Sequence, residues 1–178
     1  MDKWYRPGQY NVIDPSMKAG KDVKIGSFNV IYEGVELGEG TVVGNHCELG
    51  KNLKTGKNVV IQGRVRIASD CVIEDNVQLK IGTILTSGVR LKEGSFMGPG
   101  SITLGSTAYR VTQHGTVIGK RTYIGGGVKI AADTKIGDDI VVGAQAFVNR
   151  DIMEPGVYGG IPVKFIKNHG EEFYRSVE

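Results

Sequence analysis

Apolar residues recur at every sixth position along most of the chain. From Ile13 to Met97, thirteen of the fifteen residues at this spacing are large and aliphatic, and from Ile118 to Val148 all six are. A period of six fits neither an α-helix, whose apolar face recurs every 3.6 residues, nor a long alternating strand. It indicates a short strand followed by a turn. We call the aliphatic residue of each six-residue unit its ladder residue.

Three such units form a triangular coil of eighteen residues, and stacked coils satisfy their backbones by parallel hydrogen bonding. Glycine often follows the ladder residue, so we expect corners where glycine reaches a positive φ. The predicted fold class is all-β: a parallel β-helix solenoid of about seven triangular coils, roughly 34 Å tall at ~4.8 Å per coil. We assign residues 1–153 to the solenoid domain and 154–178 to a C-terminal tail with a short helix.

The ladder stops at Met97 and resumes at Ile118, which is three whole units plus three residues. An insertion of three, nine or fifteen residues satisfies this spacing, and we expect a loop insertion around 103–115. Loops on a rigid scaffold commonly carry binding residues. This loop contains Tyr109 and Arg110, which could stack on and pair with a substrate such as a nucleotide sugar, and it ends in His114.

Composition narrows the class of protein. A chain of 178 residues can bury a core without metals or disulfides. Cys47 and Cys71 fall at inward positions and have neither disulfide-framework nor metal-site spacing, so we expect buried packing. The net charge of +3 comes from scattered residues and gives no nucleic-acid footprint. We see no signal peptide and no apolar run long enough to span a membrane, and therefore expect a cytoplasmic protein.

The last third of the chain contains the segments VVGAQAFV, DIMEPG and GIPVKFIK. With the six-residue repeat, these resemble the closing coils of the hexapeptide-repeat acyltransferases. The segment VRLKEGSFMGPGSITLG is similar to a stretch of the nucleotide-sugar N-acetyltransferases in that superfamily. The resemblance implies a left-handed β-helix, a homotrimer with sites between subunits, and acetyl-CoA as the acyl donor. Gln145 and Val163 are mild departures from the usual pattern.

The same resemblance suggests where the acyl donor binds. It places the pantetheine arm beside backbone groups of the last coils, where glycine lets a ligand approach the main chain. Basic side chains nearby would face the phosphates through charge-assisted hydrogen bonds. The predicted donor-binding residues are Gly126, Gly127, Ala144, Gln145, Arg150, Lys164 and Lys167.

Transfer of an acetyl group to an amine needs a base, and histidine, with an ordinary pKa of about 6.5, suits that role. His114 is the first candidate. His46 is the second, although it lies about three coils, or roughly 14 Å, from the loop, so both are not expected to act on one atom. His169 is expected in a solvated tail. Asn45 and Asn76 are candidate acceptor-binding residues on corners.

The predicted function is direct transfer of an acetyl group from acetyl-CoA to the amine of a nucleotide-linked amino sugar, with a histidine general base. O-acetylation of a sugar or an antibiotic is an alternative on the same scaffold. A non-catalytic β-helix trimer is another, and coenzyme A binding would distinguish it. A γ-type carbonic anhydrase is excluded because its zinc site needs three histidines, two of them five residues apart. We expect no metal.

Overall fold

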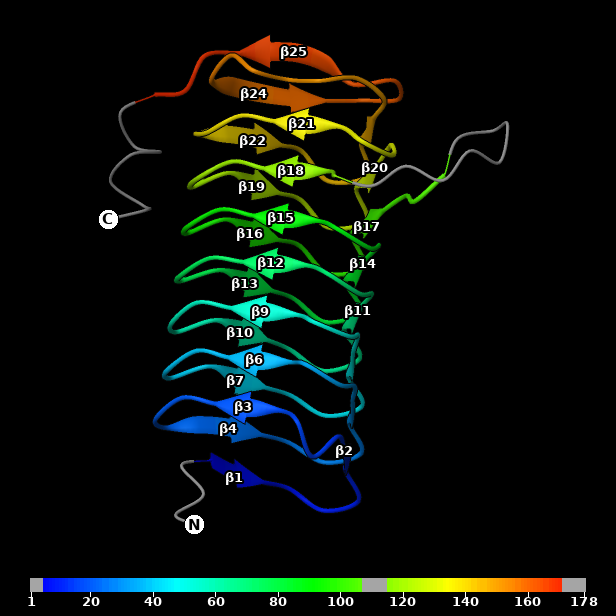
Figure 1. The fold of residues 1–178 in the computed structure, drawn as a ribbon. Coiled ribbons are helices and arrows are strands. Elements are labelled where there is room, and N and C mark those ends of the chain that lie inside the picture. The colour runs from blue at the N-terminus through cyan, green and yellow to red at the C-terminus, as the bar shows by residue number, and fades with distance from the viewer. Residues whose placement is uncertain (1–4, 107–114, 171–178) are drawn as a thin grey trace.

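The computed structural model describes residues 5–106 and 115–170, with side chains from residue 8. Figure 1 shows a straight solenoid of short strands stacked along one axis, from β1 near the N-terminus to β25 at the opposite end. No helix occurs in these described residues. The predicted fold class, an all-β, left-handed parallel β-helix, is confirmed.

The strands form three sheets, which the chain visits in the order A, B, C in every coil. Sheet A contains β1 (Tyr5–Pro7), β4 (Val23–Ile25), β7 (Val42–Val43), β10 (Val60–Ile61), β13 (Gln78–Leu79), β16 (Phe96–Met97), β19 (Tyr123–Ile124), β22 (Ile140–Val142), β24 (Gly156–Gly159) and β25 (Lys164–Lys167). Sheet B contains β2 (Val12–Ile13), β5 (Val30–Ile31), β8 (Glu48–Leu49), β11 (Arg66–Ile67), β14 (Ile84–Leu85), β17 (Ile102–Thr103), β20 (Lys129–Ile130) and β23 (Phe147–Val148). Sheet C contains β3 (Lys18–Ala19), β6 (Glu36–Leu37), β9 (Lys54–Thr55), β12 (Val72–Ile73), β15 (Arg90–Leu91), β18 (Val117–Ile118) and β21 (Lys135–Ile136). We name the corners between them A–B, B–C and C–A.

The ladder residues fill the centre of the prism. Ile61 pairs in register with Val43 in the coil below and Leu79 in the coil above, and all three side chains are buried. Residues two positions earlier, such as Val59 and Val77, also point inward and are buried. Removing these apolar side chains from water contributes roughly 25 cal/mol per Å². The core is therefore a column that runs the length of the solenoid.

The corners differ from the expectation in their physical detail. The left-handed residue is the third after the ladder residue, as at His46 (φ 58°) and Asn76 (φ 59°). Asparagine, aspartate, histidine and glycine reach this region most easily. The glycine directly after the ladder residue serves another purpose. At Gly119, an added Cβ would lie 2.2 Å from the carbonyl carbon and oxygen of Gly137, so this position needs glycine for close approach between coils.

The solenoid has about eight turns rather than seven. Both ends add parallel rungs that lack the six-residue signature: β1 pairs with β4, and β24 pairs with β22. β24 extends the solenoid past residue 153, and β25 folds back on it antiparallel. The expected helix is not found at residues 154–170, and residues 171–178 lie outside the described part.

The loop insertion adds nine residues. Thr103 pairs with Ile130, 27 positions later, whereas unbroken coils pair residues 18 positions apart, as Ile31 and Leu49 do. The chain leaves the solenoid after β17 and rejoins it at β18, so the loop insertion starts from the B–C corner. Of the three insertion lengths that the sequence allowed, the register selects nine.

The close approach at Gly119 can be tested by substitution. Gly119→Ala should lower the free energy of unfolding by about 1–3 kcal/mol, because the new methyl group overlaps the Gly137 backbone. Gly143 is the matched control, since it also follows a ladder residue but an added Cβ there is 3.4 Å from its nearest neighbour, the Tyr158 carbonyl oxygen. Gly143→Ala should stay within about 0.5 kcal/mol in urea denaturation. Equal effects of the two substitutions would refute this account of the corner.

Candidate functional site

The faces of the prism differ in chemistry. Ion pairs concentrate on sheet C and the C–A corner, for example Lys18–Glu36 and Lys57–Glu39. Exposed large apolar side chains lie elsewhere in the described part, on sheets A and B, the A–B corner and the C-terminal end. They are Tyr10, Val12, Phe28, Tyr32, Val42, Ile81, Leu104, Tyr123, Met153, Ile161, Phe165 and Ile166. Sheets A and B are therefore the faces suited to contact with the apolar surface of another protein chain.

Four predicted donor-binding residues lie together at the A–B corner of neighbouring coils. The amide of Gly127 donates to the Pro99 carbonyl (2.8 Å) and the amide of Gln145 donates to the Gly126 carbonyl (2.9 Å), so these groups are used between coils. The amides of Gly126 and Ala144 form no hydrogen bond within residues 5–106 and 115–170. Two adjacent amides at this corner are consequently available to a ligand.

The predicted phosphate-binding cations are not brought together. Lys164 pairs with Gly159 at the end of β25 near the A–B corner, whereas Lys167 lies opposite Val157 at the other end of that strand. Arg150 follows β23 and lies at the B–C corner. All three side chains are exposed. Only Lys164 shares a corner with the two available amides.

His46 lies at the A–B corner, where its exposed ring stacks on Phe28 with centroids 5.0 Å apart, and Phe28 stacks on Tyr10 at 5.2 Å. Because the loop leaves from the B–C corner three coils higher, His46 is distant from it, as expected from the sequence. Asn45 uses its Oδ1 atom to accept a hydrogen bond from the Ser27 amide (2.7 Å). These residues take part in the contacts between coils.

Asn76 lies at the C–A corner, where its Oδ1 atom is 3.4 Å from Nδ2 of Asn58. Asn45 and Asn76 are thus on different edges and do not form one acceptor site within a single chain. His114, Tyr109 and Arg110 lie outside the described residues.

The rejoining end of the loop contacts a carboxylate that the sequence analysis missed. A Cβ added to Gly115 would lie 3.2 Å from Oδ1 of Asp133, so this carboxylate borders the residue that follows His114. Asp133 is exposed at the B–C corner with φ 58°. The spacing of 18 residues from Gly115 is the sequence signal that could have identified it.

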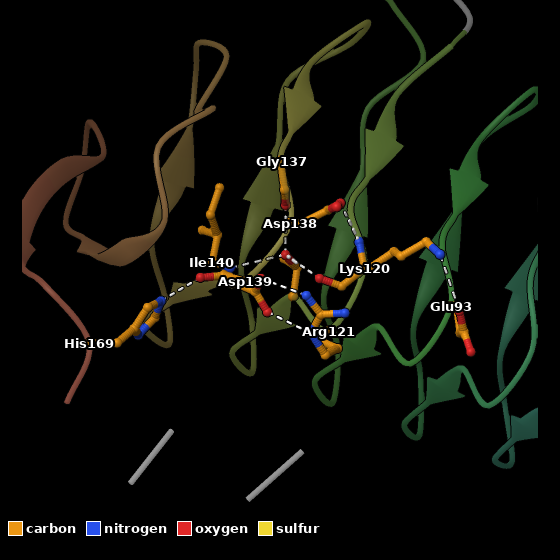
Figure 2. Close-up of polar contacts among 9 residues, drawn as sticks. Glu93, Lys120, Arg121, Gly137, Asp138, Asp139, Ile140 and His169 are labelled. Atoms are coloured by element: carbon orange, nitrogen blue, oxygen red, sulfur yellow. Dashed lines mark hydrogen bonds and ion pairs between the residues drawn. The ribbon is translucent and has the colours of Figure 1, made fainter. Parts of the chain in front are cut away.

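The C–A corner near the C-terminal end is held by charged groups (Figure 2). Arg121 donates from Nε and Nη2 to the two carboxylate oxygens of Asp139, each at 2.7 Å, and this carboxylate raises the pKa of Arg121. Oδ1 of Asp138 accepts from the Lys120 amide (2.7 Å), and Lys120 also pairs with Glu93 (3.2 Å). These groups tie three successive coils together.

His169 was expected in a solvated tail, but the structure gives it a partner at this corner. Its ring nitrogen Nε2 hydrogen-bonds the carbonyl oxygen of Asp139, as Figure 2 shows. The contact fastens the chain that follows β25 to the side of the solenoid. His169 therefore has a structural role in the described part of the protein.

Two hollows of similar size open on sheet C. One, of about 420 Å³, is lined by Lys54, Thr55, Gly56, Val72, Ile73, Glu74, Asp75 and Glu93. The other, of about 430 Å³, lies nearer the C-terminal end and is lined by Lys92, Val117, Lys135, Ile136, Gly137, Asp138, Asp139, Met153 and Pro155. Within the described residues, no group of three His, Cys, Asp or Glu side chains is placed to hold a metal ion, and no helix could span a membrane.

Comparison with known proteins agrees with the repeat. The sequence model of the family "Bacterial transferase hexapeptide (six repeats)" matches residues 20–51 and 115–150. The two matched segments make up less than half of the chain, and both carry the six-residue repeat. A 56-residue stretch is 41% identical to WbbJ of Escherichia coli K12, described as a lipopolysaccharide biosynthesis O-acetyl transferase. That match covers 32% of this chain and 29% of WbbJ.

Two solved structures share the solenoid fold of this chain. The UDP-N-acetylglucosamine acyltransferase LpxA of Bacteroides fragilis matches with a TM-score of 0.73 and 15% identity, over 90% of this chain and 74% of LpxA. PerB of Caulobacter crescentus, in complex with CoA and GDP-perosamine, matches with a TM-score of 0.56 and 20% identity, over 91% of this chain and 56% of PerB. The chain thus spans little more than half of PerB and less than a third of WbbJ.

Both cysteines are buried, as the sequence predicted, and burial raises the pKa of the Cys71 thiol to about 11. At pH 8 only about one Cys71 thiol in a thousand would then be ionised, against roughly a quarter for an exposed cysteine with a pKa near 8.5. Labelling of the native protein with iodoacetamide should therefore modify Cys71 at least a hundredfold more slowly than labelling in 8 M urea, as read by mass spectrometry. Rapid labelling of the native protein would contradict the buried placement.

Proposed function

We propose that this protein transfers an acetyl group from acetyl-CoA to the amine of a nucleotide-linked amino sugar. The observation that carries the proposal is the second repeat segment that matches the hexapeptide transferase family, residues 115–150, which contains both available corner amides, Gly126 and Ala144. Successive coils are ~4.8 Å apart, so the two amides can bind successive polar groups of an extended ligand. The pantetheine arm of coenzyme A is such a ligand.

The residues around this corner fit the rest of the donor. Lys164 is exposed at the same corner and supplies a cation for a phosphate group. Lys167 and Arg150 lie on other edges, so in our proposal they reach the same donor only from a neighbouring copy of the chain. The exposed apolar residues of sheets A and B favour such an assembly, and we propose a homotrimer with sites between subunits.

We propose His114 as the general base of the transfer. The acceptor amine attacks the thioester carbonyl carbon, the carbon–sulfur bond breaks, and the base moves the amine proton to the departing sulfur. A histidine with an ordinary pKa near neutrality can both take and return this proton. In our proposal Asp133, whose carboxylate borders Gly115, orients this base. Use of acetyl-CoA also favours a cytoplasmic location.

The printed descriptions of similar proteins support two acceptor chemistries. The structure of PerB was solved in complex with CoA and GDP-perosamine. This complex favours a nucleotide-linked amino sugar as the acceptor. The WbbJ match favours a sugar hydroxyl instead, so O-acetylation is the second candidate. Both acceptors use the same donor site and the same base, and they differ in the atom that attacks.

A thiol-release assay tests the proposal. With acetyl-CoA and a panel of nucleotide-linked amino sugars and simple sugars, we expect turnover that His114→Ala reduces by about a hundredfold or more, because general-base catalysis contributes about that much. His46→Ala is the control, since His46 lies at another corner three coils away, and it should retain turnover within about threefold. Acetylation of a hydroxyl rather than an amine, read by mass spectrometry of the product, would favour the second candidate.

Absence of thiol release with every acceptor, together with no binding of acetyl-CoA in calorimetry, would overturn the transferase proposal. Full turnover in His114→Ala would leave the transferase proposal standing and show that His114 is not the general base.

A further inference from the structure

Most cations on sheet C and its corners are neutralised by a carboxylate in a neighbouring coil. Glu36 lies between Lys18 (3.5 Å) and Lys54 (4.0 Å) on the outer row of this sheet. Lys57, Lys120 and Arg121 on the C–A corner also have acidic partners. This alternation of charge is what a solvated sheet face requires, and it leaves little net attraction for an anion.

The pattern breaks near the C-terminal end of the same sheet. Arg90 and Lys135 occupy the outer row on either side of Val117, in register with it, and Lys92 lies two residues along the rung from Arg90. None of these three cations forms an ion pair within residues 5–106 and 115–170. Two of them, Lys92 and Lys135, line the hollow of about 430 Å³. That volume is within the usual range of small-molecule sites.

Lys92 directly follows a ladder residue, and in the two coils above it the residue at the same position is glycine, which leaves space for the hollow. Gly119 and Gly137 occupy the next two coils, where the close approach of backbones excludes a side chain. Val117 forms the apolar floor and Met153 and Pro155 form the upper wall. A ligand in the hollow would therefore meet bare backbone, two ammonium groups and the two lining aspartates, Asp138 and Asp139.

The carboxylates around the hollow are occupied with other groups. Asp139 is held by Arg121, and Oδ1 of Asp138 accepts from the Lys120 amide, as Figure 2 shows. Oε2 of Glu74, one coil below Lys92, accepts from the Glu93 amide (3.0 Å), and Oδ1 of Asp151 accepts from the Lys135 amide (2.9 Å). Asp139 is thus neutralised by Arg121, whereas the other three carboxylates keep their charge but form no ion pair with Arg90, Lys92 or Lys135 in the described part of the chain.

We infer that this hollow is an anion-binding site for the diphosphate of a phosphate ester, held by Lys92 and Lys135 with Arg90 at its edge. Cations on two rungs ~9.6 Å apart bracket an anion that carries charge on two adjacent phosphates. The hollow is also next to the loop, because Val117 is the second residue after Gly115. That the diphosphate belongs to a substrate of acetyl transfer rests on the proposed function, whereas the anion site itself does not.

The first test measures binding of inorganic pyrophosphate to the full chain by calorimetry at low ionic strength. The Lys92→Gln/Lys135→Gln double variant should bind at least tenfold more weakly than the wild type. Lys54→Gln is the matched control, because Lys54 is on the same outer row but has Glu36 as its partner, and it should bind within twofold of the wild type. Thermal denaturation should show that all three proteins are folded. Equal binding by the wild type and the double variant, or no binding by the wild type, would overturn the inference.

The source of the diphosphate is distinguished by repeating the titration with UDP and with coenzyme A. Loss of UDP binding alone in the double variant supports the site as that of a nucleotide-linked acceptor, and loss of coenzyme A binding alone supports it as part of the donor site. If the protein neither releases thiol nor binds acetyl-CoA but still binds pyrophosphate through the two lysines, the transferase proposal fails and the anion site stands.

Discussion

The parallel register between coils is the constraint on which the rest of this structure depends. In most units the amide after the ladder residue donates to the ladder carbonyl of the next coil, as Gly26 does to Val43 (2.8 Å) and Gly119 to Ile136 (2.8 Å). Backbone groups in the wall are satisfied only while this register holds, since an unpaired buried amide or carbonyl is costly. Ligand chemistry is therefore left to positions that the register does not use: corner tips, outer rows and the single loop.

The fold was predictable because the same constraint acts on side chains at a fixed period. A ladder residue such as Leu79 must be apolar wherever its coil stacks on another, so the repeat is visible in the sequence. The two end strands of the solenoid were harder to predict from the sequence. Tyr5–Pro7 and Gly156–Gly159 join the stack through backbone pairing without the six-residue signature, and the count of coils was therefore short by about one. The tail also contains an antiparallel strand, Lys164–Lys167, which pairs with β24 and which the six-residue pattern does not indicate.

The candidate site was predictable only in part. Resemblance pointed to residues, and the structure clusters Gly126, Gly127, Ala144 and Gln145 at one corner because their spacing is close to one coil. The structure does not bring Arg150 and Lys164 together. The corner and the coil on which a residue lies depend on its position within the 18-residue period, and the tail that contains Lys164 no longer follows that period. The same periodicity explains what was missed. Asp133 lies 18 residues after Gly115, and Lys135 and Arg90 flank Val117 only once the nine-residue insertion is counted.

The structure thus offers two candidate ligand-binding regions around the last coils, the corner amides between sheets A and B and the cationic hollow on sheet C. The loop leaves from the corner between sheets B and C. The most direct test of the donor corner is amide hydrogen exchange with and without saturating acetyl-CoA. If acetyl-CoA binds at this corner, exchange at Gly126 and Ala144 should slow at least tenfold when it is present. Gly63, whose amide also forms no hydrogen bond within the described residues at the same corner of a lower coil, should be unchanged. Unchanged exchange at Gly126 and Ala144 while acetyl-CoA is bound would contradict the account.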